Sequence, residues 1–81
     1  MASKLTEESI VRALSKYLKK DQGRYFLGSK DLDRARDILS KRENIHLELR
    51  DSPAGNRLLT IGRLTTRKII PVVVIIVKND D

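Results

Sequence analysis

The sequence predicts a single α+β domain in which two helices pack on one face of a three- or four-stranded, mainly antiparallel sheet. Apolar residues recur at three- and four-residue spacing in two N-terminal segments, whereas from residue 45 onward the spacing falls to two. A length of 81 residues favours one domain over 1–81, with frayed ends at 1–4 and 79–81. The expected order is helix, short strand, helix and three strands.

The first helix is predicted at about 6–21. Thr6 is a good N-cap, and the acidic side chains of Glu7 and Glu8 suit a helix N-terminus. The apolar stripe that follows comprises Ile10, Val11, Leu14, Tyr17 and Leu18. Gly23 would then end the helix in a left-handed conformation.

A short strand or extended connector is predicted at 24–27, ended by Gly28. Ser29 is the expected cap of a second helix at about 30–42. The apolar face of this helix would comprise Leu32, Ala35, Ile38 and Leu39.

The C-terminal half reads as three strands joined by two turns. Apolar and polar residues alternate over 45–50, which indicates a half-buried strand. The segment 51–56 is dense in turn-forming residues, and 57–63 is the second strand. A polar turn at 65–68 leads to the third strand at 69–78.

This last strand does not alternate. Residues 72–77 are apolar on both faces, a pattern expected where both faces are covered. Two short helices cover only one face, so the sequence predicts a homodimer through 69–77. Pro71 fits only near the start of the strand or at an edge.

The charge balance points to an anionic partner. Seventeen Lys and Arg residues against eleven Asp and Glu leave a net charge of +6. The abundance of both signs, with many Ile and Val residues and no cysteine, is typical of thermophilic proteins. Without cysteine, disulfides, thiolate nucleophiles and Cys-ligated zinc are excluded. No apolar run approaches the ~20 residues of a membrane span, so we expect a cytoplasmic protein without membrane association.

Two basic clusters are the candidate nucleic-acid-binding residues. The first comprises Lys16, Lys19, Lys20, Arg24, Tyr25 and Lys30. The second comprises Arg57, Arg63, Arg67 and Lys68. Lys and Arg bind phosphates, Tyr25 could stack on an unpaired base, and Gly62 would allow a close approach. The alternative is that the cations serve solubility and discourage edge pairing while Tyr25 lies in the core.

Catalytic and metal-binding patterns are lacking, so we expect no enzymatic activity, no metal and no cofactor. His46 stands alone, whereas zinc needs three or four ligands at ordered spacing. Asp37 followed by Glu48-Leu49-Arg50 faintly resembles the Asp…Glu-x-Lys pattern of metal-dependent nucleases, but Arg50 replaces the lysine.

Two classes of function remain. The first is a non-catalytic nucleic-acid-binding or ribonucleoprotein-associated protein that contacts the phosphate backbone of DNA or RNA. The second is an interaction or assembly module, or a homodimeric structural protein, without a nucleic-acid role. A winged-helix DNA-binding regulator is a variant of the first class, but it needs a third helix before residue 45, where there is little room.

Overall fold

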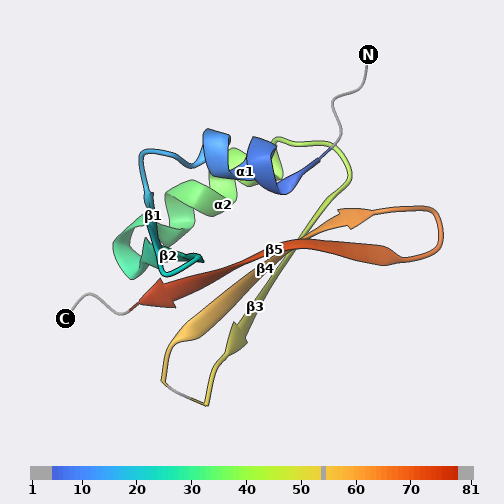
Figure 1. The fold of residues 1–81 in the computed structure, drawn as a ribbon. Coiled ribbons are helices and arrows are strands. Elements are labelled where there is room, and N and C mark those ends of the chain that lie inside the picture. The colour runs from blue at the N-terminus through green and yellow to red at the C-terminus, as the bar shows by residue number, and fades with distance from the viewer. Residues whose placement is uncertain (1–4, 54, 79–81) are drawn as a thin grey trace.

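The structure, a computed structural model, describes residues 5–53 and 55–78. In this part of the chain two α-helices pack on a five-stranded mixed sheet (Figure 1). The predicted α+β class is confirmed. The sheet, however, has more strands than the three or four predicted, and it contains a parallel pair. The predicted frayed ends, 1–4 and 79–81, lie outside the described residues.

Along the chain the elements are α1 (Glu7–Ala13), β1 (Leu18–Asp21), β2 (Arg24–Gly28), the 3-10 helix η1 (Ser29–Asp31), α2 (Leu32–Ser40), β3 (Ile45–Asp51), β4 (Arg57–Leu64) and β5 (Ile69–Lys78). The strand order in the sheet is β1-β2-β5-β4-β3. Strands β2 and β5 are parallel, and the other neighbours are antiparallel.

Helix α1 begins as predicted but ends early. Thr6 is its N-cap and accepts a hydrogen bond from the Ser9 backbone N–H at 3.1 Å, while Ser9 Oγ accepts one from the Thr6 N–H at 3.0 Å. The helix ends at Ala13, so the predicted extension to residue 21 is wrong. Tyr17 and Leu18 still pack against the core, which explains why the apolar spacing continues beyond the helix.

The segment expected to end that helix instead forms a β-hairpin. Gln22 has φ 51° and Gly23 has φ 76°, and two successive positive φ values are what a two-residue type I′ turn requires. Asp21 and Arg24 face each other directly across this turn. Gly23 is therefore a hairpin residue rather than a helix terminator, and β1 is a strand that the sequence analysis missed.

The second helix is shorter than predicted. Ser29 begins η1 instead of capping α2, whose N-cap is Asp31. The predicted apolar face is confirmed: Leu32, Ala35 and Leu39 are buried, and Ile38 packs against the same cluster.

The three C-terminal strands lie close to their predicted bounds. The turn between β4 and β5 is closed by Thr65, whose Oγ1 donates to the Lys68 carbonyl at 2.7 Å and accepts from the Lys68 N–H at 3.0 Å. Pro71 is the third residue of β5, opposite Gly62 at a register shift. Among the described residues β2 pairs only with residues 75–78 of β5, so Pro71 lies near the start of its strand with no partner on the β2 side, in keeping with the positions that the sequence allows it.

Gly62 allows a close approach, but within the fold. A Cβ at this position would lie 2.8 Å from Ile69 Cγ2 and 3.1 Å from the Ile70 carbonyl oxygen. The absence of a side chain thus lets β5 pass close to β4 at the register shift.

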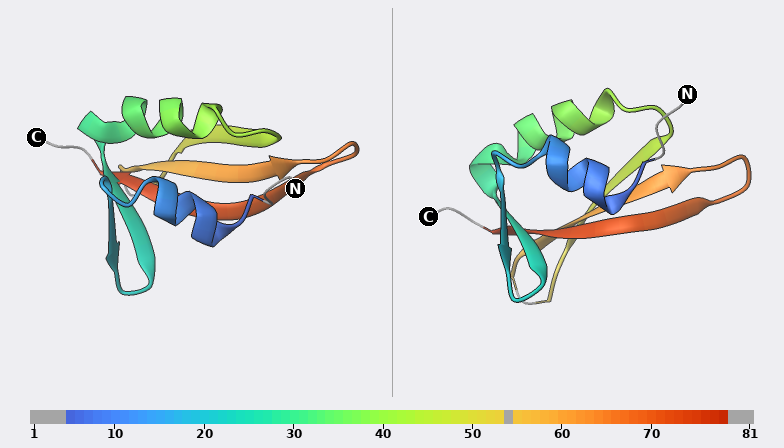
Figure 2. Two further views of the ribbon diagram at one scale, coloured as in Figure 1. Left: turned by 90° about the horizontal axis from the view of Figure 1, so that it is seen from above. Right: turned by 45° about the horizontal axis from the view of Figure 1, so that its top comes forward.

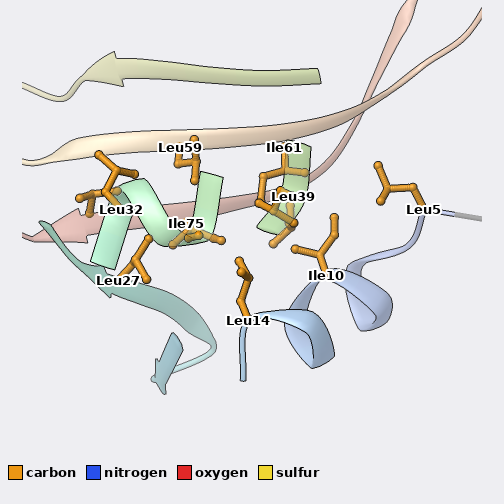
Figure 3. Packing of buried hydrophobic residues seen from close by; sticks show 12 residues of the cluster. Leu5, Ile10, Leu14, Leu27, Leu32, Leu39, Leu59, Ile61 and Ile75 are labelled. Atoms are coloured by element: carbon orange, nitrogen blue, oxygen red, sulfur yellow. The ribbon is translucent and has the colours of Figure 1, made fainter. Parts of the chain in front are cut away.

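Both helices pack on the same face of the sheet, and the core lies between the helices and that face (Figure 3). Ile10 of α1, Leu14 at the C-cap of that helix and Leu39 of α2 meet Leu59 and Ile75 of the central strands. Each of these side chains is 1% exposed or less. We call this the covered face of the sheet.

The opposite face, which we call the open face, carries no helix in the described part of the chain (Figure 2). Val74 in β5 is 47% exposed there, whereas its neighbour Val73 is 6% exposed on the covered face. The apolar character of β5 on both sides therefore leaves apolar surface open to solvent.

The two adjacent valines should respond differently to the same substitution. Val73→Lys buries an unpaired charge and should lower the free energy of unfolding by about 3 kcal/mol or more. Val74→Lys places the ammonium group in solvent and should change it by less than about 1 kcal/mol. Urea denaturation followed by circular dichroism measures both values. Equal losses for the two variants would contradict the assignment of faces.

The type I′ turn makes a second prediction. A Cβ at Gly23 meets no atom within 4 Å, so Gly23→Ala should act through its φ of 76° alone. We expect a loss of about 1 kcal/mol in the free energy of unfolding. Gly23→Asn should lose less, because Asn tolerates positive φ. The same urea titrations measure both variants, and a neutral alanine variant would contradict the turn.

Candidate nucleic-acid interface

The β1–β2 hairpin brings four residues of the first predicted cluster together. Lys19 and Lys20 lie on β1, and Arg24 and Tyr25 lie on β2. Adjacent residues of a strand point to opposite faces of the sheet, so the hairpin presents cations on both sides.

On the covered side, Lys20 lies opposite Tyr25, with Nζ 5.6 Å from the ring centroid. Tyr25 is half-buried and packs against the core. The structure therefore brings the predicted stacking residue next to a cation, but on the face that the helices cover.

On the open side, Lys19 lies opposite Phe26, which is half-buried but does not belong to the core cluster. Lys78 at the end of β5 places Nζ 4.3 Å from the Phe26 ring centroid. Neither Phe26 nor Lys78 is among the residues predicted from the sequence to bind nucleic acid. In a strand at 24–27 with Leu27 in the core, alternation places Phe26 on the other face, so the sequence carries a signal for Phe26.

The strand registers align a row of open-face residues across the whole sheet. From β1 to β3 the row consists of Lys19, Phe26, Ile76, Leu58 and Arg50. At the usual strand spacing of ~4.8 Å, its two cationic ends are about 19 Å apart. Three apolar side chains thus lie between a lysine and an arginine.

Two shallow hollows adjoin the hairpin. One, of about 440 Å³, lies beside the unpaired part of β5 and is lined by Arg24, Tyr25, Pro71 and Val74, among others. The second, of about 350 Å³, includes Lys19, Phe26 and Lys78, together with the carboxylates of Asp21 and Asp31. Phe26 and its neighbours are therefore accessible from solvent.

The other two members of the first cluster flank the hairpin in sequence. Lys16 lies in the connection between α1 and β1, and Lys30 lies in η1. Both are exposed.

The second predicted cluster is divided by the sheet. Arg63, Arg67 and Lys68 lie at the β4–β5 turn, at the opposite end of the molecule from the β1–β2 hairpin (Figures 1 and 2). Arg57 begins β4 six positions before Arg63, which places it about 20 Å away along the strand. The ten predicted nucleic-acid-binding residues therefore do not form one continuous surface.

The cations of the β1–β2 hairpin remain available to a ligand. Ion pairs in the described part of the chain include Arg12–Glu8 at 2.9 Å, Lys41–Asp37 at 3.9 Å and Arg50–Glu48 at 3.0 Å. Lys19, Lys20 and Arg24 are exposed and form no ion pair with another described residue. Such cations can take up phosphate without first breaking an ion pair.

The residues that faintly resemble the nuclease pattern do not come together in the described part of the chain. Asp37 lies on α2 over the covered face, whereas Glu48 belongs to the open-face register, so the sheet separates these two carboxylates. Within 5–53 and 55–78, no three His, Cys, Asp or Glu side chains are grouped to hold a metal.

Helices of the described residues are limited in length and number. None is long and apolar enough to cross a membrane. Between α2 and β3 the described chain forms no further helix, so the recognition helix that a winged-helix protein needs is absent from this stretch. Strands β4 and β5 lie inside the sheet instead of forming a separate wing.

No protein-family model, no curated protein and no solved structure matches this chain.

Proposed function

We propose that this chain is a small nucleic-acid-binding protein that contacts the phosphate backbone through the β1–β2 hairpin. The observation that carries the proposal is the gathering of Lys19, Lys20, Arg24 and Lys78 around Tyr25 and Phe26 at one end of the sheet. The net charge of +6 supports it, because it attracts a polyanion at long range. Phosphate contacts need no deep pocket, only accessible cations on a fixed frame.

The hairpin proposal is tested by two triple variants that remove equal charge. One changes Lys19, Lys20 and Arg24 to Gln, and the other changes Arg63, Arg67 and Lys68 to Gln. Each lowers the net charge from +6 to +3, so any difference between them reports position and not total charge. Fluorescence anisotropy with labelled RNA and DNA at ~50 and ~200 mM salt measures affinity and its salt dependence.

We expect the hairpin triple to weaken binding about tenfold or more at ~50 mM salt and to flatten the log–log salt slope by about 2 units. The turn triple should retain most of the affinity. If the turn triple abolishes binding while the hairpin triple does not, the interface lies at the β4–β5 turn. If the unmodified protein binds no nucleic acid at ~50 mM salt, the proposal fails.

A second candidate function, self-assembly through 69–77, is favoured by the position of the exposed apolar side chains. In the described part of the chain the large exposed ones are Leu64 at 41%, Ile69 at 46% and Val74 at 47%. They all lie on the β4–β5 hairpin. In a two-fold dimer the same strand of both copies would cover them.

Light scattering tests this assembly. If it forms, the unmodified protein at a concentration of ~100 μM should have the mass of a dimer. Val74→Lys should then give a folded monomer, because it places a charge in the interface without disturbing the core. A monomeric mass for the unmodified protein at this concentration would exclude assembly through 69–77.

A further inference from the structure

We propose that the open face of the sheet binds single-stranded nucleic acid. One unpaired base stacks on Phe26, and the bases next to it in the strand pack on Ile76 and Leu58. The inference rests on the proposed function and names the form of nucleic acid that the site takes. Aromatic side chains on an open sheet are a common platform for unpaired bases, because every base offers a π-face.

The row across the open face supports this assignment because cationic side chains flank apolar ones. Lys19 and Arg50 lie at its two ends, where a backbone passing over the sheet would place phosphates. The middle is apolar, where bases would lie. Arg50 is paired with Glu48, but its own side chain is 68% exposed and that of Glu48 is 41% exposed. Pairs this open to solvent contribute little, so a phosphate can compete for the guanidinium.

Lys78 now occupies the position over the Phe26 ring that a base would take. Its Nζ lies 4.3 Å from the ring centroid. Stacking of a base on an aromatic ring is typically stronger than an exposed cation–π contact. The base therefore displaces the ammonium group, which is then free to meet a phosphate of the same strand.

Duplex nucleic acid does not fit this face. In a duplex the bases are stacked on each other, and the phosphates form the outer surface. Laying that surface on Phe26, Ile76 and Leu58 would desolvate phosphates against hydrocarbon. A single strand can instead turn its bases to the sheet and its phosphates to the rim.

Charge also favours a nucleic acid over a second copy on this face. In the described part of the chain, its register positions carry Lys19, Arg24, Arg50 and Lys78 against the acids Asp21 and Glu48. Two identical faces with a cationic excess repel each other, whereas a polyanion is attracted to either.

The direct experiment uses the fact that the chain contains a single Phe. Incorporating 4-fluorophenylalanine therefore labels Phe26 alone and gives one ¹⁹F resonance. The labelled protein is titrated with single-stranded RNA and DNA of roughly 12 nucleotides and with a duplex of the same length. We expect the resonance to shift and saturate with a single strand, and to stay in place with the duplex. The RNA and DNA arms then show which sugar is preferred.

Two variants from the same row separate stacking from phosphate contact. Phe26→Leu keeps an apolar side chain and should weaken single-strand binding about tenfold while leaving the salt slope unchanged. Lys19→Gln, its matched control, should flatten the slope by about 0.7. Duplex affinity should be unchanged in Phe26→Leu.

Each outcome decides between the two proposals. If anisotropy shows salt-dependent binding but the ¹⁹F resonance does not move, the chain binds nucleic acid elsewhere; the stacking site fails and the proposed function stands. If no nucleic acid binds, both fail. If the resonance shifts with protein concentration alone, a second copy covers the face, and the stacking site is overturned.

Discussion

The two helices cover only one face of the β4–β5 pair, and the other features of the structure depend on this. Helices of 7 and 9 residues supply enough apolar surface for one face of the sheet, and the core forms there. The other face of the same strands keeps Val74, Ile76 and Leu58 in contact with solvent. The proposed interface is a direct result of this imbalance, because a fold with too few helices leaves its sheet available for a partner.

Most of the C-terminal half could be predicted from residue spacing alone. The alternation of Ile45, Leu47 and Leu49 shows which face of β3 packs inward, and the turn formers at 51–56 and 65–68 separate the strands. These signals are local, so a single sequence carries them. The α+β class and the inward face of α2 follow for the same reason.

The N-terminal half was harder to predict because two periodicities overlap. Tyr17 and Leu18 continue the helical spacing of α1 and yet pack on the core from outside the helix. Only the backbone at Gln22 and Gly23 separates a helix end from a hairpin, and a lone glycine is compatible with both. The open-face row was beyond local reasoning altogether, since it depends on β2 lying beside β5, a pairing between segments distant in sequence.

The pairing of β2 with β5 affects the order in which the molecule folds. Tyr25 lies beside Ile75, so β2 and β5 close a loop of fifty residues (75 − 25), whereas the turns joining β3, β4 and β5 span only a few. Chain entropy makes the long closure about 2 kcal/mol more costly. The three C-terminal strands can therefore form first, with the β1–β2 hairpin docking last and opening first. A ligand that contacts both the β1–β2 hairpin and β5 would therefore stabilise the strand pairing that opens first.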